Sequence, residues 1–189
     1  RQYKSLDPSM LELFSPSSQT MTSRIIDYLC LKENLLPFEF DAVDAFYQAP
    51  VASDEIIFAK PPAEAKEYLR ACGQPDNIIW QCLKHLPGPR KASSGWCDYF
   101  SEILTEKLNF SRCPAHPQFF QSPPESARIV IEMHVDDGHG GAESETAIRE
   151  FREELMKYTP LKGAEPIPYG TEYVHLKRPR IHYHDYVVL

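Results

Sequence analysis

The sequence lacks long apolar runs, internal repeats and low-complexity tracts. Charged residues interrupt every apolar stretch, so none approaches the roughly 20 residues that a membrane-spanning helix requires. No signal peptide is recognisable near Arg1, and the chain begins without Met, which we interpret as a segment of a longer protein. These absences predict a protein with no membrane partner that is intracellular, in a cytoplasmic particle or in the nucleus, and is not secreted.

Cysteine is present, but without the spacing of a metal site or a disulfide framework. The five cysteines are odd in number and widely spaced, with no Cys-x-x-Cys pair. Such cysteines are typical of reduced thiols in an intracellular protein. We therefore expect free, buried thiols at Cys30, Cys72, Cys82, Cys97 and Cys113.

Positive charge is scarce overall. The chain has 20 Lys and Arg residues against 27 Asp and Glu residues, for a net charge of −7. This balance argues against an extensive nucleic-acid surface, because phosphate binding needs clustered Lys and Arg. Local basic clusters can still polarise the field, and the run from Lys177 to Arg180 could contact phosphate or form a solvated edge.

The pattern that is present predicts an α+β domain. A chain of 189 residues, of which 42% are hydrophobic, can bury one core with a smaller lobe attached, and its 17 prolines divide it into short elements. Apolar periodicity predicts helices over residues 20–31, through Trp96 and Phe100, and after the capping residue Ser144. Pro62, suited to a first helical turn, and Gly73, suited to a C-terminal cap, predict a helix over residues 62–73. Strands are predicted over residues 38–46, with a turn near Asp44, and over 55–60, 77–83, 128–135, 171–178 and 181–188.

This order of elements is that of a split βαβ domain, a ferredoxin-like antiparallel sheet with helices on one face. Trp96 is expected in the core because its helical spacing explains it.

Three aspartates could carry chemistry. Asp41 lies on one predicted strand, and Asp136 and Asp137 follow another, where Asp136–Asp137–Gly138 predicts a hairpin turn. If the strands are adjacent, the carboxylates could hold two divalent cations about 4 Å apart, as phosphoryl transfer requires. Mg²⁺ prefers such oxygen ligands. The alternative interpretation is an ordinary hairpin tip, in which Asp and Gly serve only the turn.

Six segments in the same order resemble the copia-type retrotransposon reverse transcriptase, an RNA-directed DNA polymerase. They cover residues 10–178, and each is weak alone. The segments are FSPSSQTMTSRIIDYL, FEFDAVDAFYQAP, DEIIFAKPPAE, CLKHLPGPRKASSGW, IVIEMHVDDGHGG and PYGTEYVHLKR. They are similar to the family's Phe-Ser-Pro helix, its first catalytic strand, its Pro-Pro segment, its Leu-Lys-Gln segment, its Tyr-Val-Asp-Asp hairpin and its Phe-Leu-Gly segment.

The resemblance implies a reverse-transcriptase palm, formed by residues 36–51 and 93–189, with partial fingers at 1–35 and 52–92. It makes Asp41, Asp136 and Asp137 the catalytic ligands of Mg²⁺ or Mn²⁺. The implied nucleotide-binding residues are Asp44, Ala45, Phe46 and Lys91, and the implied primer-binding residues are His134, Tyr169 and Gly170. The expected partners are an RNA or DNA template-primer and deoxynucleotide triphosphates. Integrase and ribonuclease H domains are expected outside this chain.

The chain departs from the family at several positions. His134 replaces the tyrosine before Val-Asp-Asp, and Lys91 replaces a glutamine that holds the nucleotide, although a lysine cannot reproduce an amide's paired donor and acceptor. The upstream basic strands of the fingers, which clamp the triphosphate, are missing as well. We therefore expect weak polymerisation from this chain. For Phe46, packing in the hydrophobic core is an alternative to a role in nucleotide binding.

Two other functions stay open. The domain could be a catalytically decayed palm that acts as a nucleic-acid-binding or structural module, or an unrelated ferredoxin-like ligand-binding domain. The histidines of HVDDGHGG and of His182-x-His184 show no recognised metal-ligand spacing, so we expect them to be scattered on the surface.

Overall fold

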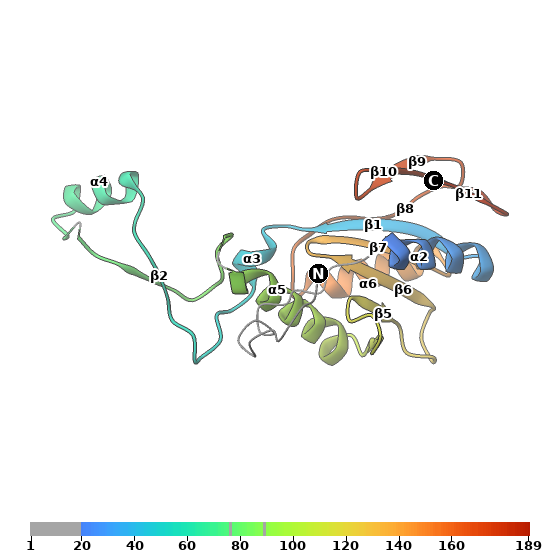
Figure 1. The fold of residues 1–189 in the computed structure, drawn as a ribbon, viewed down its shortest axis with the longest axis horizontal. Coiled ribbons are helices and arrows are strands. Elements are labelled where there is room, and N and C mark those ends of the chain that lie inside the picture. Colours follow the sequence, from blue (N-terminus) through green and yellow to red (C-terminus); the bar gives the residue numbers. More distant parts are fainter. Residues whose placement is uncertain (1–19, 76, 89) are drawn as a thin grey trace, which may run out of the picture.

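A computed structural model describes residues 20–75, 77–88 and 90–189, and a six-stranded antiparallel sheet lies at its centre (Figure 1). The predicted α+β class is confirmed. The strand order is β4-β5-β6-β7-β1-β8. These strands are β1 (Leu36–Ala42), β4 (Ser111–Arg112), β5 (Phe119–Gln121), β6 (Ile129–His134), β7 (Asp137–Ala142) and β8 (Leu161–Pro166).

One face of the sheet carries the main apolar core. Helix α5 (Arg90–Glu102), the π-helical turn η1 (Ile103–Lys107) and helix α6 (Glu145–Met156) supply its helical side. The helical stripes predicted for these segments are buried, with Trp96, Phe100 and Leu155 at most 1% exposed. Ser144 caps α6 as predicted, because its hydroxyl accepts a hydrogen bond from the Ala147 amide at 3.1 Å.

The opposite face of the sheet is covered as well, so the prediction of helices on one face is wrong. Helix α2 (Thr20–Glu33) packs there, with Ile26 and Cys30 against Val130 of β6. Val130 and its neighbour Ile131 point to opposite faces, because side chains alternate along a strand. The second face carries buried polar side chains, and these obtain partners from α2 and the C-terminal strands.

The three C-terminal strands form a small separate sheet beside this second face. They are β9 (Glu172–His175), β10 (Arg178–His182) and β11 (Val187–Val188), in the order β11-β10-β9. The two strand-like segments predicted here do pair. Pro179, however, lies inside β10 and pairs with Val174 instead of separating two strands.

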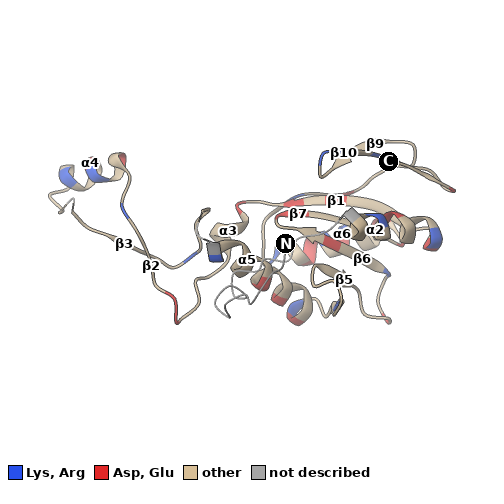
Figure 2. Cartoon of the chain, in the orientation of Figure 1, with Lys and Arg blue, Asp and Glu red and all other residues tan. Residues whose placement is uncertain are grey.

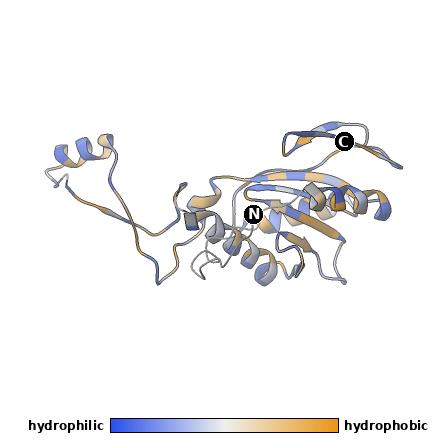
Figure 3. Ribbon diagram, viewed as in Figure 1, coloured by the Kyte–Doolittle hydropathy of each residue, from blue (hydrophilic) through white to orange (hydrophobic). Residues whose placement is uncertain are grey.

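Glycines in β7 make room for phenylalanines of β1. Gly138 lies opposite Phe40 and Gly140 opposite Phe38 in the strand register. A Cβ atom on Gly138 would lie 2.2 Å from the Phe40 ring, and one on Gly140 would lie 2.6 Å from the Val130 carbonyl oxygen. The absence of side chains at these glycines therefore lets the Phe38 and Phe40 rings pack directly against β7. Strand β6, on the other side of β7, is the most continuously apolar strand of the sheet (Figure 3).

Residues 51–75 and 77–84 form an arm that extends away from the sheet (Figure 1). The arm contains β2 (Ile57–Ala59), β3 (Trp80–Cys82) and helix α4 (Ala63–Ala71), and no residue of α4 is buried. Large apolar side chains such as Phe58 and Leu83 are exposed there. The arm lies within the range 52–92, apart from Val51, that the resemblance assigns to the fingers. Helix α2, which the resemblance also assigns to the fingers, packs on β6 and β7 of the central sheet.

Two further predictions need correction. No strand was predicted at residues 161–166, yet β8 forms the edge of the sheet beside β1. All five cysteines are free, but only Cys30 and Cys97 are buried, and Cys72 is exposed. Residues 1–19, including the Phe-Ser-Pro segment, lie outside the described residues. None of the described helices combines the length and apolarity needed to cross a membrane.

Candidate functional site

The three predicted aspartates lie together at one end of the central strands. Asp41 of β1 pairs directly with Asp137 of β7. Residues opposite each other in antiparallel strands have Cα atoms about 4.5–5.5 Å apart. The amide of Ala42 donates a hydrogen bond to the Asp136 carbonyl at 2.9 Å, which joins β1 to the hairpin tip. Acidic segments of β1 and β7 accordingly run side by side (Figure 2).

The hairpin tip is built differently from the sequence prediction. The turn consists of Val135 and Asp136, whereas Asp137 and Gly138 already belong to β7. Val135 has φ 60°, a left-handed conformation that is unfavourable for a β-branched residue. The Asp-Gly pair therefore does not form the turn, and a strained valine takes the place that turn chemistry would give to glycine or asparagine.

Trp96 of α5 holds this strained tip. Its indole Nε1 donates a hydrogen bond to the Val135 carbonyl at 2.7 Å, and the side chain is fully buried. The prediction that Trp96 is a core residue is confirmed. In addition, the hydrogen bond fixes the backbone between the strand end and the two hairpin aspartates.

The carboxylates affect one another electrostatically. Partial burial, together with the negative charges of Asp136 and Asp41, raises the pKa of Asp137 above its ordinary value. Burial also raises the pKa of Glu39, which lies two residues before Asp41 on the same face of β1, and the charge of Asp137 adds to that effect. A cation at this end of the sheet would relieve the repulsion.

A cleft of about 810 Å³ opens beside the aspartates. Asp41, Asp137 and His134 line it from the central sheet, and Lys177 and Arg178 line it from the β9–β10 turn. Lys162 of β8 also lines the cleft and pairs with Asp41 in the strand register. Exposed cations thus lie beside the carboxylates, although the chain is acidic overall. Sequence analysis missed Lys162 because β8 itself was not predicted.

A second, smaller pocket of about 250 Å³ adjoins the same aspartates. It is lined by Asp41 and Asp136 together with Asp44, Ala45 and Phe46, which follow β1. Asp44 is exposed with φ 53°, Ala45 is buried at the start of the short helix α3 (Ala45–Gln48), and Phe46 packs partly against the core. The predicted nucleotide-binding residues of this segment are therefore brought to the aspartates.

Not all of the other predicted nucleotide- and primer-binding residues lie beside the aspartates. Lys91 lines a different pocket with His85 and Asp98. The Tyr169 hydroxyl donates to the Asn34 side chain at 3.5 Å, near the far end of β1, where Leu36 is roughly 17 Å along the strand from Asp41.

Gly170, next to Tyr169, bonds through its amide to the His182 carbonyl at 2.8 Å. The part of the C-terminal sheet that reaches the aspartates is instead the β9–β10 turn. Arg180, in the predicted basic cluster, is 3% exposed and pairs with Asp27, so it is not available to phosphate.

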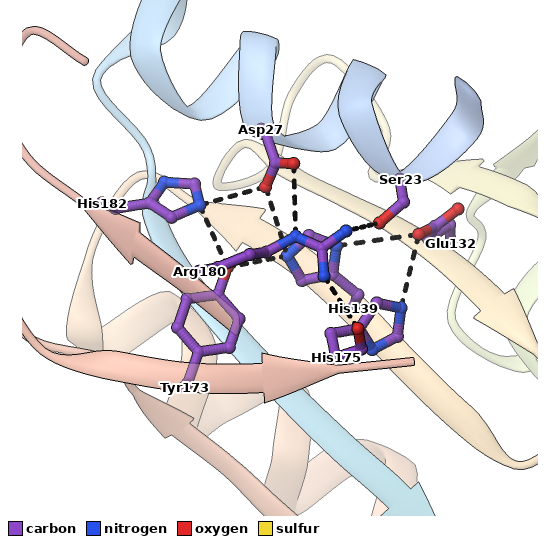
Figure 4. A network of polar contacts seen from close by, with 8 residues as sticks. All are labelled: Ser23, Asp27, Glu132, His139, Tyr173, His175, Arg180 and His182. Carbon is purple, nitrogen blue, oxygen red and sulfur yellow. Dashed lines mark hydrogen bonds and ion pairs between the residues drawn. The ribbon is translucent and has the colours of Figure 1, made fainter. Parts of the chain in front are cut away.

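A buried polar network lies under α2 and the C-terminal sheet (Figure 4). Asp27 of α2 accepts from Arg180 at 3.3 Å and contacts His182 at 3.0 Å. Burial alone would raise the pKa of Asp27, but the hydrogen bond from His182 and the charges of His139 and Arg180 bring it below its ordinary value. Arg180 also donates to the His175 carbonyl at 3.0 Å and to the Ser23 hydroxyl.

The remainder of the network is centred on Glu132 of β6. His139 of β7 and His175 of β9 face this carboxylate, and all three side chains are at most 3% exposed. Burial would raise the pKa of Glu132, yet the two histidines hold it below its ordinary value, whereas burial lowers the pKa of His139. Both Glu132 oxygens, His139 Nδ1 and His175 Nε2 have no hydrogen-bond partner. Each such buried polar atom costs about 1–3 kcal/mol.

The histidine prediction was wrong for two of the residues it covered. His139 and His182 are buried, and only His184 of that group is exposed. Sequence spacing could not reveal the cluster, because its members lie on β6, β7 and β9. The polar Glu132 within the apolar run of β6 was the one local signal, since an isolated carboxylate in a buried strand requires partners.

The aspartate cluster offers hard oxygen donors of the kind that Mg²⁺ and Mn²⁺ prefer, and the mutual repulsion at Asp137 fits a place for a cation. The buried cluster offers two imidazoles and one carboxylate, a different donor set. No protein-family model, curated protein sequence or solved structure matches this chain.

Proposed function

We propose that the chain is the palm, with part of the fingers, of an RNA-directed DNA polymerase of the copia-type reverse transcriptase class. The observation that carries the proposal is the pairing of Asp41 with Asp137 beside the turn that contains Asp136. Asp41 is more than ninety positions away from Asp136 and Asp137 in the chain, yet the three residues meet at one end of the sheet. Nucleotidyl transfer needs such a group of carboxylates.

The arrangement of the strands supports the same proposal. Strand β1, helix α5, the β6–β7 hairpin, helix α6 and strand β8 follow one another in the chain, and the strands lie in the order β6-β7-β1-β8. This is the split βαβ order, in which the first strand lies between the hairpin and the last strand. A fold alone does not specify activity, so the aspartate geometry remains the deciding feature.

The strained hairpin tip is a second supporting feature. Unfavourable backbone conformations persist where the surrounding structure holds them, and they cluster at functional sites. Here Trp96 holds Val135 through a partly buried hydrogen bond of 2.7 Å. If Asp136 and Asp137 served only to make a turn, glycine or asparagine at position 135 would make it with less strain.

Within the proposed site, Asp41, Asp136 and Asp137 would hold Mg²⁺ or Mn²⁺. When bound, the cations activate the attacking 3′-oxygen and stabilise the leaving group. Lys162 and Arg178, exposed in the cleft, would bind phosphates of the primer or nucleotide by charge. Phe46, in the pocket beside Asp41 and Asp136, would contact the sugar of the nucleotide.

Primer extension tests the proposal. We expect slow incorporation of deoxynucleotides on an RNA template with Mg²⁺ or Mn²⁺, because the net charge of −7 opposes binding of the template-primer. Asp136→Asn should reduce the rate by on the order of 100-fold or more. Asp185→Asn, at an exposed aspartate before β11, is the matched control and should leave the rate unchanged.

Equal incorporation by the wild-type protein and Asp136→Asn, with both folded by circular dichroism, would exclude the proposal. Mn²⁺ binding measured by electron paramagnetic resonance provides an independent test, in which Asp41→Asn should weaken binding. If the wild-type protein binds a labelled primer-template but incorporates nothing, the domain is a nucleic-acid-binding module instead. The position of Lys91, outside the aspartate cleft, would agree with that outcome.

A further inference from the structure

The Glu132 cluster contains four buried polar atoms that have no hydrogen-bond partner, and three of them, Glu132 Oε1, His139 Nδ1 and His175 Nε2, lie close together. Glu132 contributes both carboxylate oxygens, His139 contributes Nδ1 and His175 contributes Nε2. Glu132 and His139 are fully buried, and His175 is 3% exposed. The three residues come from β6, β7 and β9, and in Figure 4 the two imidazoles point toward the same carboxylate. Buried polar groups are nearly always paired, so this arrangement requires an explanation.

The distances within the cluster are those of ligands around a shared ion. Glu132 Oε1 lies 3.7 Å from His139 Nδ1 and 3.5 Å from His175 Nε2. These separations exceed the 2.7–3.2 Å of an ordinary hydrogen bond. Two ligand atoms that are each about 2.1 Å from a tetrahedral zinc ion lie about 3.4 Å apart. The observed separations therefore suit one ion between the three side chains better than direct hydrogen bonds.

We propose that Glu132, His139 and His175 bind one Zn²⁺ ion, or a similar divalent ion that favours imidazole nitrogen. All three ligand atoms lie within 4.8 Å of one another. Two histidines and one carboxylate form an established zinc donor set with a fourth position left for water. The site is independent of the proposed polymerase activity, and its donors differ from the all-oxygen set of the three aspartates.

The surroundings of the cluster meet two further requirements of a metal site. The first is an outer partner that orients a ligand, and His139 has one because its Nε2 lies 3.0 Å from the Tyr173 hydroxyl. The second is a route for the ion, and His175 lines the cleft beside Asp41.

A neighbouring group of Asp27, His139 and His182 has similar geometry but does not need an ion. Asp27 already accepts from Arg180 at 3.3 Å, and His182 contacts both Asp27 and the Tyr173 hydroxyl at 3.0 Å. A metal ion there would also meet the positive charge of Arg180. The unpaired atoms belong to the Glu132 group, and the ion is assigned to that group for this reason.

The position of the site indicates what the ion does. Glu132 and His139 belong to the central sheet, whereas His175 belongs to the separate C-terminal sheet. A shared ion would bind the second sheet to the first and hold the β9–β10 turn beside the aspartates. Metal binding would therefore stabilise the folded chain, by an amount that rises with the logarithm of the free ion concentration once this exceeds the dissociation constant.

The test is a zinc titration of the wild-type protein after removal of metal by a chelator, in excess Mg²⁺ to occupy oxygen-rich sites. We expect one Zn²⁺ per chain and a reversible rise in melting temperature on adding Zn²⁺. Co²⁺ in place of Zn²⁺ should give the visible spectrum of a four-coordinate site with nitrogen ligands. His175→Gln and Glu132→Gln should each lower zinc affinity by about 100-fold or more, since even outer partners of ligands contribute 10 to 100-fold.

Two matched controls separate this site from other binding. His184→Gln alters an exposed histidine after β10 and should keep wild-type affinity. Asp137→Asn should also keep it, which distinguishes the site from the aspartate cluster. The proposal is overturned if the wild-type protein binds no stoichiometric zinc, or if His175→Gln binds zinc as tightly as the wild type. Should a ligand variant fail to fold, the Co²⁺ spectrum and melting temperature of the wild-type protein decide the question.

Discussion

The ion pair between Asp27 and Arg180 should be among the strongest single contributions to the docking of the C-terminal sheet. Their side chains are only 5% and 4% exposed, and Asp27 Oδ2 lies 3.3 Å from Arg180 Nε. The pKa of Asp27 lies below its ordinary value, so the carboxylate is charged at neutral pH. Asp27→Asn would keep the size of the side chain but leave the guanidinium buried without a counterion.

Removing one partner of such a buried pair costs about 3–5 kcal/mol. The same helix offers a matched control in Glu33, which pairs with Arg128 at 2.9 Å. Both of those side chains are about one-third exposed, at 31% and 34%. Solvent screening reduces the value of such a pair to about 0.2–1 kcal/mol. We therefore expect Asp27→Asn to be several times more destabilising than Glu33→Gln.

Urea unfolding at pH 7, followed by circular dichroism, measures both free energies of unfolding. Amide hydrogen exchange in β9 and β10 would detect loss of docking even if the central sheet stays folded. The double variant Asp27→Leu/Arg180→Met should lose less stability than either single change, because it leaves no unpaired charge. A cost below about 1 kcal/mol for Asp27→Asn, or equal costs for Asp27→Asn and Glu33→Gln, would refute the reasoning.

Three further predictions concern other parts of the chain. Gly138→Ala should lower the free energy of unfolding in urea by about 1–3 kcal/mol, because the new Cβ would lie 2.2 Å from the buried Phe40 ring. Adding Phe40→Leu to Gly138→Ala should partly restore stability. If the free-energy changes of the two substitutions simply add, the packing argument is contradicted. Trp96→Phe should remove the 2.7 Å hydrogen bond to Val135 and lower the free energy of unfolding by about 1–2 kcal/mol. In primer extension the same variant should lower kcat more than it raises KM. An unchanged kcat would exclude a positioning role for Trp96. Burial raises the pKa of the Cys30 thiol to about 12. At pH 8 to 9 a thiol reagent should therefore label exposed Cys72 quickly and Cys30 only on unfolding. Rapid labelling of Cys30 in the folded protein would contradict its buried position.

The local features of the fold could be read from the sequence because their causes are local. Helices α2 and α6 follow from apolar periodicity and, for α6, from the Ser144 cap. Helix α4 follows from its boundary residues Pro62 and Gly73, and strand β6 from a continuous apolar run. The sequence hypothesis also required that the strands of Asp41 and Asp137 be adjacent, and in the structure the two residues pair. These predictions depend on side chains within one element or on a known order of elements.

Other features depend on contacts between distant segments, and the sequence carried little signal for them. Strand β8 has few β-forming residues and forms by pairing with β1, where Lys162 then faces Asp41. The hairpin turn falls at Val135 and Asp136 because the register that places Gly138 under Phe40 determines it, against the local preference for Asp-Gly.

The sequence by itself indicated the α+β class, most of the elements and three aspartates that could meet if their strands were adjacent. Only the tertiary structure decided that Glu132, His139 and His175 share one buried space, because three strands from two sheets must meet to enclose it. Ligand spacing along the chain has no meaning for such a site. The physical reason is that burial and pairing of polar groups depend on which strands pack together, which no local pattern encodes.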